Sequence, residues 1–320
     1  MPLLDVQDLT IEYGTARGAV TALDEVSLQV EAGEFLGIVG ESGCGKSTLL
    51  FGVAQLLSPP AAVTGGSVRF DGRELVGASV RDLNALRWSR ISVVMQSAMN
   101  ALSPVKTVGS QYRDVLRAHR YDGDWPSRSR EVLELVGVDP VHLSSYPHQL
   151  SGGMRQRAMI AMALLFTPDL ILMDEPTSAL DVVAQRSLMV QIKELQRELG
   201  FAVVFVTHDM SLVSHFSDRL VVMYGGQIAE TGPTRAVFDT PRHPYSAGLL
   251  DAFPSIRGSR VRLTGIPGAP PDLASPPPGC RFAPRCPSSS DICAEGRPPL
   301  YRIDPVQVRC VLHAPKEVSA

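Results

Sequence analysis

The sequence has few features of a membrane-spanning, secreted or nucleic-acid-binding chain. No apolar run approaches the ~18 residues that a membrane span needs. The longest, 158–166, stops at Thr167-Pro168. The N-terminus has no basic region followed by a long apolar core, so no signal peptide is expected. Lys and Arg number 30 against 33 Asp and Glu, which gives a formal net charge of −3. Because no basic excess is present, nucleic acid is not an expected partner.

The length and apolar content fit one large domain with an addition. The chain has 320 residues, of which 44% are apolar, enough for a full core. Without a spanning segment, we expect a cytoplasmic protein with no pore of its own. If it drives transport, separate membrane subunits must supply the path.

Residues 40–47 read Gly-Glu-Ser-Gly-Cys-Gly-Lys-Ser and fit the phosphate-loop pattern G-x-x-x-x-G-K-[ST]. An apolar strand is expected at 35–39 and a helix at 47–57. The glycines let backbone N–H groups point at phosphate oxygens, and the helix adds its positive N-terminal end. Lys46 would reach the β and γ phosphates, and Ser47 would place a hydroxyl on Mg²⁺. The alternative is a turn that binds nothing, and the flanking elements favour the phosphate site.

Residues 170–175 form a short apolar run that ends in two carboxylates, Asp174 and Glu175. A buried parallel strand has this composition, and its carboxyl end is where α/β sheets bind ligands. Asp174 would hold Mg²⁺, and Glu175 would orient or deprotonate a water near the γ phosphate. The alternative is that the two acids merely follow the end of a strand, where turns favour such residues.

Residues 150–157 read Leu-Ser-Gly-Gly-Met-Arg-Gln-Arg. Ser151 is a good helix N-cap, and Gly152 and Gly153 allow close backbone approach, so a phosphate could dock here too. Two phosphate-binding helix starts in one chain suggest a dimer that shares its nucleotides. At this point the chain resembles the ATP-binding-cassette (ABC) ATPases, whose signature is L-S-G-G-Q. Met154 stands where glutamine is usual.

The resemblance covers residues 1 to about 235 and implies further roles. Gln96 matches the residue that senses Mg²⁺ and the attacking water, and His208 the residue that contacts the γ phosphate. Tyr13 is placed like the aromatic that stacks on adenine, and residues 178–181 match the loop that touches a partner subunit. The implied catalytic residues are Glu175, His208 and Gln96, and the implied Mg²⁺ ligands are Ser47, Gln96 and Asp174. The implied ATP-binding residues are Tyr13, Gly40, Ser42, Gly43, Cys44, Gly45, Lys46, Ser47, Thr48, Ser151, Gly152 and Gly153.

The expected fold is α/β, a P-loop NTPase with a mainly parallel central sheet. Residues 3–13 and an alternating stretch through Val30 predict an N-terminal antiparallel β layer. Apolar strands are expected at 35–39, 91–95, 170–174 and 202–207. Other expected elements are a helical insertion at about 97–165, a helix at 181–199 that Gly200 stops, and a hairpin of 220–224 with 227–231. The expected domains are an ABC ATPase domain at 1–240 and a Pro/Cys-rich extension at 241–320.

The C-terminal extension carries four of the five cysteines in the spacing C-x5-C-x6-C-x16-C: Cys280, Cys286, Cys293 and Cys310. Its composition is Pro-rich, so little regular structure is expected. In a cytoplasmic chain, clustered cysteines indicate a metal site rather than disulfides. No C-x2–4-C pair typical of zinc is present. A [4Fe–4S] cluster is the favoured interpretation, with zinc and free thiols as alternatives.

His-Pro-Tyr at 243–245 together with this cysteine-rich end resembles the oligopeptide/dipeptide importer branch of the ABC ATPases. That resemblance implies an ATP-hydrolysing subunit, peripheral on the cytoplasmic face of the membrane, that energises peptide uptake. The implied partners are a second ATPase, expected to be a different paralogous chain, two transmembrane permease subunits and an extracytoplasmic substrate-binding protein. Residues 97–105 are expected in the groove that receives a permease helix. Alternatives are uptake of nickel or another small solute, a soluble non-transport ABC ATPase, and an exporter.

Overall fold

The computed structural model describes residues 1–16, 18–96, 101–178, 180–252 and 265–315. Its contacts divide the chain into two compact units. The first comprises residues 1–3, 30–35 and 77–206. The second comprises residues 4–29, 36–76 and 207–320.

The first unit contains three parallel strands and most of the predicted helical insertion. Strand β7 (Leu170–Asp174) lies between β6 (Ile91–Val94) and β8 (Ala202–Val206) and is parallel to both. Every residue of β7 and β8 is buried, which explains their uninterrupted apolar sequences. The three strand predictions are confirmed to within one residue at each end.

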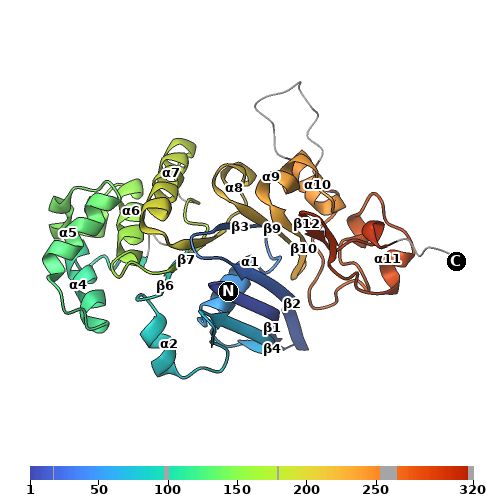
Figure 1. Ribbon diagram of the computed structural model, residues 1–320, viewed down its shortest axis with the longest axis horizontal. Coiled ribbons are helices and arrows are strands. Elements are labelled where there is room, and N and C mark those ends of the chain that lie inside the picture. The colour runs from blue at the N-terminus through green and yellow to red at the C-terminus, as the bar shows by residue number, and fades with distance from the viewer. Residues whose placement is uncertain (17, 97–100, 179, 253–264, 316–320) are drawn as a thin grey trace. The chain divides into compact units, whose positions relative to one another are not determined.

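Each described helix of the first unit follows a Ser, Thr or Asp, the residue types favoured at helix N-caps. These helices are α2 (Val80–Leu86), α4 (Val108–Ala118), α5 (Trp125–Leu135), α6 (Gly152–Ala163) and α7 (Val182–Leu199). Thr107 caps α4, and Asp181 caps α7 by accepting the N–H of Ala184 at 2.9 Å. Gly200 ends α7 at φ 76. Figure 1 shows α4, α5 and α6 grouped together. Two short 3₁₀ turns, Pro140–Ser144 and Pro147–Gln149, lie between α5 and α6 along the chain.

The second unit contains the predicted antiparallel β layer. Its strand order is β2 (Gly18–Val30), β1 (Leu4–Thr15), β4 (Ala61–Phe70) and β5 (Arg73–Glu74). Val26, Leu28 and Val30 alternate with exposed residues and are buried, as the sequence pattern predicts. Helix α1 (Lys46–Val53) packs on β1. The helix prediction for 47–57 was four residues too long, because Ala54 is the C-cap and Gln55 turns the chain at φ 52.

The second unit also contains a mixed set of strands that ends in the C-terminal extension. Strand β3 (Phe35–Val39) is parallel to β9 (Arg219–Tyr224), which forms the predicted hairpin with β10 (Gln227–Pro233). Strand β12 (Val306–Val308) adds to β10, and β11 (Tyr301–Ile303) adds to β12, both antiparallel. The helices of this unit are α1, α8 (Met210–Phe216), α9 (Thr234–Asp239), α10 (Pro244–Asp251) and α11 (Ile292–Glu295), and two 3₁₀ turns lie at Ala283–Arg285 and Val311–His313.

The expectation of little regular structure after Thr240 was therefore wrong in part. The stretch 267–279 does lack helix and strand. However, α10 precedes it in the same extension, and Val306 and Val308 bury their side chains as β12 joins the sheet. Strands of three residues are too short to give a periodic signal in a sequence.

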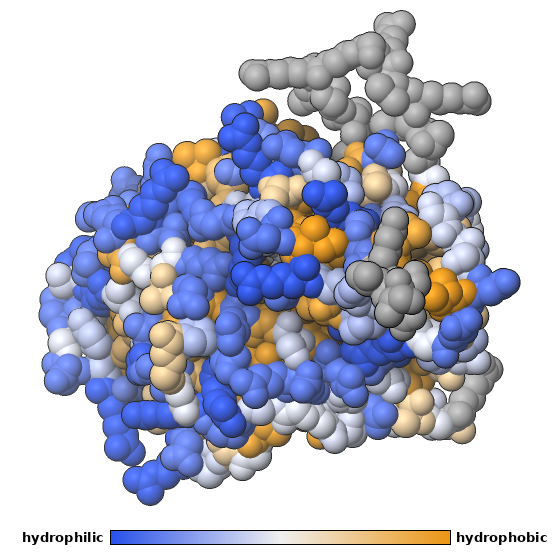
Figure 2. All heavy atoms as spheres, turned by 45° about the vertical axis from the view of Figure 1, so that its right-hand side comes forward, coloured by the Kyte–Doolittle hydropathy of each residue, from blue (hydrophilic) through white to orange (hydrophobic). Residues whose placement is uncertain are grey.

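The surface view agrees with the balanced composition. The face shown in Figure 2 is mostly hydrophilic, with hydrophobic residues in small separate groups. Among the described residues, no helix combines the length and the apolar content needed to cross a bilayer.

Candidate active site

The loop after β3 has the backbone of a phosphate cradle. Gly40, Gly43 and Gly45 have φ angles of 151°, 79° and 99°, which favour glycine. A Cβ at Gly40 would lie 2.2 Å from the carbonyl oxygen of Met223, and one at Gly45 2.7 Å from that of Ala22. At Gly43, no atom of the described residues lies within 4 Å of such a Cβ. Packing thus fixes the two ends of the loop, and its middle stays open.

Lys46 begins α1 and folds back over the loop. Its Nζ donates to the carbonyl oxygens of Gly40 at 2.8 Å and Glu41 at 3.0 Å, and the residue is 8% exposed. Cys44 lies beneath it, and burial raises the pKa of the Cys44 thiol. The carbonyl of Cys44 accepts the N–H of Gly226 at 3.0 Å, so the β9–β10 hairpin supports the loop from below.

Tyr13, Thr48 and His208 are further predicted site residues of the same unit. The hydroxyls of Tyr13 and Thr48 lie 3.3 Å apart, which places the end of β1 against the first turn of α1. His208 is exposed. The N–H of the preceding residue, Thr207, donates to the carbonyl of Ile38 in β3 at 3.1 Å. Tyr13 thus contacts the start of α1, and the segment that carries His208 is tied to β3.

The two predicted carboxylates end strand β7 in the first unit. Asp174 is 3% exposed, which is costly for a carboxylate unless a cation or hydrogen bonds stabilise it. Glu175 has φ 43, and its N–H donates to the carbonyl of Val206 at 2.9 Å. The amide of Gln96, after β6, donates to Oε2 of Glu175 at 2.7 Å. The structure therefore brings Gln96 and Glu175 together, as their assigned roles around one water require.

The signature segment starts helix α6 as predicted. The Ser151 hydroxyl accepts the N–H of Met154 at 3.3 Å. Gly153 borders a cavity of about 330 Å³, lined also by Arg157 and by the first residues of α7. Arg157 donates to the carbonyl of Val136 at 2.9 Å, which fixes α6 against the end of α5.

The loop at 178–181 lies beside this cavity. Its Leu180 and Asp181 line the cavity, and Ala179 lies outside the described residues. The side-chain amide of Gln185 donates to the carbonyls of Thr177 and Leu180 at 3.0 and 3.1 Å. Helix α7 thus contacts Thr177 and Leu180, the described residues on either side of Ser178 and Ala179.

The segment predicted to contact a permease helix, residues 97–105, lies only partly within the described residues. Residues 97–100, including Met99, lie outside the described residues. Leu102 is 3% exposed, whereas Val105 is 80% exposed. Of these two apolar side chains, Val105 is the one available for contact with a partner.

Sequence analysis missed one feature of the site, a contact between the C-terminal extension and the phosphate loop. Arg285 forms a two-pronged ion pair with Glu41, with Nη1 2.6 Å from Oε2 and Nη2 3.0 Å from Oε1. The N–H of Glu41 donates to the hydroxyl of Tyr245 at 2.8 Å. The only signal of this contact in the sequence is Glu41 itself, because a carboxylate in a phosphate-binding loop requires a compensating positive charge.

The His-Pro-Tyr segment positions that tyrosine. Burial lowers the pKa of His243 to about 4, so its ring is neutral at pH 7, and Nδ1 accepts the N–H of Tyr245 at 3.0 Å. Tyr245 is fully buried against the rings of Tyr224 and Phe282. Burial also raises the pKa of the Tyr245 hydroxyl, which stays protonated.

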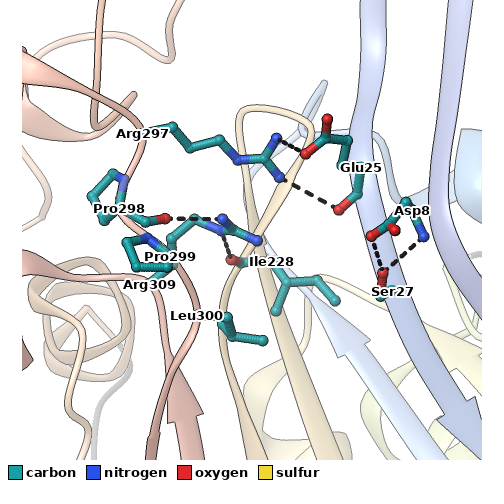
Figure 3. Close-up of a pocket in the computed structure, with 9 residues that line it drawn as sticks. All are labelled: Asp8, Glu25, Ser27, Ile228, Arg297, Pro298, Pro299, Leu300 and Arg309. Atoms are coloured by element: carbon teal, nitrogen blue, oxygen red, sulfur yellow. Dashed lines mark hydrogen bonds and ion pairs between the residues drawn. The ribbon is translucent and has the colours of Figure 1, made fainter.

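Three further arginines fasten the extension to its unit. Arg281 donates to Asp24 at 2.7 Å, and Arg297 donates to Asp24 at 3.1 Å and to Glu25 at 2.7 Å. Arg309 donates to the carbonyls of Ile228 at 3.0 Å and Pro298 at 2.9 Å. Figure 3 shows Arg297 reaching Glu25 and Arg309 reaching Ile228 and Pro298.

The four cysteines of the extension line one cavity of about 10 Å³. Burial raises the pKa of the Cys280, Cys286 and Cys310 thiols, so a positive metal ion would have to offset the cost of ionising them. The donor set suits a metal–thiolate centre. The arrangement does not, because the described residues contain no group of three or more His, Cys, Asp or Glu side chains placed to hold a metal.

A buried strand, a glycine-rich loop and a lysine at the start of the next helix define a P-loop nucleotide-binding protein. Similarity to solved structures narrows the class of nucleotide-binding protein. An ATP-binding cassette solved as a dimer in a post-hydrolysis state, bound to ADP and Pi, matches with TM-score 0.65 and 30% identity. The match covers 72% of this chain and 99% of that one.

Sequence relatives identify the branch. A family model described as "ABC transporter" matches residues 23–178, and one described as "Oligopeptide/dipeptide transporter, C-terminal region" matches residues 229–293. The oligopeptide transport ATP-binding protein OppD of Salmonella typhimurium is 42% identical over 320 residues, 99% of this chain and 95% of the relative. The dipeptide transport ATP-binding protein DppD of Bacillus subtilis is 42% identical over 316 residues, 97% and 94% of the two chains. The chain belongs to the ABC transporter ATPases, in their oligopeptide/dipeptide branch.

Proposed function

We propose that this chain is the ATP-hydrolysing subunit of a membrane importer for dipeptides and oligopeptides. The observation that carries the proposal is the identity of 42% along almost the whole chain to ATP-binding proteins named for oligopeptide and dipeptide transport. The match of residues 229–293 to the C-terminal region of that branch supports it. Exporters and soluble ABC ATPases are disfavoured for the same reason.

In this proposal, ATP binds with its phosphates on the loop formed by Gly40, Ser42, Gly43, Cys44 and Gly45. Lys46, whose Nζ lies over the loop at the carbonyls of Gly40 and Glu41, binds the β and γ phosphates. Thr48 completes the first turn of α1, and Tyr13, which touches it, stacks on adenine.

We assign hydrolysis to the residues that the resemblance implies. Ser47, Gln96 and Asp174 offer the hydroxyl, amide and carboxylate oxygens that Mg²⁺ prefers, and the ion would neutralise charge on the β and γ phosphates. Glu175 orients a water and accepts its proton. Gln96 holds Glu175 through the 2.7 Å bond and positions the same water, and His208 contacts the γ phosphate.

We assign Ser151, Gly152 and Gly153 to the nucleotide of a second ATPase subunit. A capped helix start with an adjacent open cavity suits a phosphate that another chain presents. The second subunit is expected to be a paralogous chain. The remaining partners are two transmembrane permeases and an extracytoplasmic substrate-binding protein, so the chain works at the cytoplasmic face of the membrane. Residues 97–105 are assigned to the permease contact, and residues 1–240 and 241–320 to the cassette and its extension.

Peptide uptake tests the proposal directly. In the organism of origin, deletion of the gene is expected to abolish ATP-dependent uptake of a labelled dipeptide or oligopeptide, and the wild-type gene should restore it. Uptake of labelled nickel serves as the control for the alternative cargo. Loss of nickel uptake with normal peptide uptake would refute the peptide assignment and leave the ATPase assignment untouched.

We also propose that Cys280, Cys286, Cys293 and Cys310 hold a metal centre, as a [4Fe–4S] cluster or a zinc ion. Their gathering around one cavity supports the proposal, although the side chains as they stand do not form the site. Protein purified without oxygen should contain about four irons per chain and absorb near ~400 nm, or contain one zinc. Four titratable thiols and no bound metal would refute it.

A further inference from the structure

Glu41 presents an electrostatic problem in the phosphate loop. It is the second residue of the loop, directly after Gly40, and its carboxylate is 24% exposed. A nucleotide brings several negative charges to the same loop. Because like charges a few ångströms apart repel strongly in a partly desolvated site, an uncompensated Glu41 would oppose nucleotide binding.

The C-terminal extension supplies the compensating charge. The guanidinium of Arg285 is 6% exposed and meets both carboxylate oxygens of Glu41. Such paired contacts fix direction as well as charge. Arg285 Nε also donates to the carbonyl of Pro267 at 2.7 Å, and Arg285 Nη1 donates to the hydroxyl of Tyr224 at 3.2 Å. Arg285 is therefore held on several sides, and it holds the Glu41 side chain.

A second contact holds the backbone of the same residue. The Glu41 N–H is committed to the hydroxyl of Tyr245, and the Glu41 carbonyl accepts from Lys46. Backbone N–H groups of such loops are the groups that bind phosphate. The extension thus determines both the direction of this peptide and the charge beside it.

We propose that Arg285 is a positioning residue of the nucleotide site, which neutralises and orients Glu41 so that the phosphate loop accepts the anionic nucleotide. The proposal rests on the function assigned above. It gives the C-terminal extension a part in nucleotide affinity, in addition to any contribution to stability.

The test compares Arg285→Gln with Arg297→Gln in the intact chain. Arg297 is a matched control because it fastens the same extension through Asp24 and Glu25 and contacts no residue of 40–47 among the contacts described (Figure 3). Binding of MgATP is measured at low and at high salt, together with the melting temperature. Arg285→Gln is expected to weaken ATP binding on the order of tenfold at low salt. The loss should shrink at high salt, because screening weakens the repulsion from Glu41.

The double variant Glu41→Gln/Arg285→Gln separates charge from structure. Removing both charges leaves no repulsion, so ATP affinity should return to within about threefold of wild type even if the melting temperature stays low. Arg297→Gln should lower the melting temperature without changing ATP affinity. If Arg285→Gln does not fold, the double variant and its salt dependence still carry the test.

Three outcomes would overturn the inference. Equal ATP affinity in wild type and Arg285→Gln would give Arg285 a structural role alone. A double variant as weak as Arg285→Gln would show that Glu41 does not repel the nucleotide. A loss of affinity in Arg297→Gln as large as in Arg285→Gln would point to general loosening of the extension. A wild-type chain that binds no ATP would refute the proposed function instead, so the two failures are distinguishable.

Discussion

Replacement of Glu175 by glutamine is expected to leave ATP binding intact and to reduce ATP turnover by roughly 10²- to 10⁴-fold, the range typical for loss of a general base. The amide matches the carboxylate in shape and can still accept the hydrogen bond from Gln96. It cannot take a proton from water. The strained backbone at φ 43 is the same for both residues, so the fold should tolerate the change.

Phosphate release by the assembled transporter and binding of labelled ATP measure the two effects separately. Glu194→Gln, an exposed position on helix α7, is the control and should hydrolyse ATP normally. A Glu175→Gln variant that turns over near the wild-type rate would remove Glu175 from the base role. Weak ATP binding in this variant would mean that Glu175 acts through the nucleotide site itself.

Replacement of Lys46 by alanine is expected to weaken ATP binding about 10- to 100-fold. Hydrogen bonds from a charged donor contribute roughly 1.5–3 kcal/mol, and each 1.4 kcal/mol is about tenfold in affinity. The contacts of Lys46 to the carbonyls of Gly40 and Glu41 must be exchanged for phosphate contacts, which places the effect toward the lower end of that range.

Equilibrium binding of ATP to the isolated chain measures this effect. Lys106→Ala is the matched control, because Lys106 is an exposed lysine paired with Asp114 in the other unit. Unchanged ATP affinity in Lys46→Ala would refute the assignment of this lysine to the phosphates. A similar loss in Lys106→Ala would attribute the effect to net charge rather than to position.

The predictions from the sequence succeeded where a local pattern determines the structure. The apolar run at 170–174 became a buried strand because parallel strands bury both faces. Asp181 and Gly200 marked the ends of helix α7 because a cap and a left-handed turn are properties of a few adjacent residues. The Ser151 cap followed the same rule.

The sequence predictions failed where the deciding contact is distant in the chain, or where an apolar pattern continues past the end of the helix. Leu56 and Leu57 extend the apolar pattern of α1, but the chain already turns at Gln55. The ion pair of Glu41 with Arg285 joins residues 244 positions apart, and only the fold brings them together. The same holds for β12. Its two buried valines form a strand because they pair with β10, and the local sequence does not show that pairing.

The cysteine spacing is an intermediate case. It correctly indicated that the four thiols belong together, since all four line one cavity. It did not give their geometry, because metal-ligand geometry depends on χ angles and on loop positions that spacing does not encode. Within the described residues the thiols are neighbours without forming a metal site.

ATP-driven accumulation of a labelled peptide in proteoliposomes that contain the complete transporter tests the central claim most directly. With the peptide and its binding protein outside and ATP inside, wild-type chain should accumulate peptide in the lumen, and the Glu175→Gln chain should not. ATP hydrolysis that proceeds at the same rate with and without peptide, and with no peptide entering the vesicles, would contradict the account.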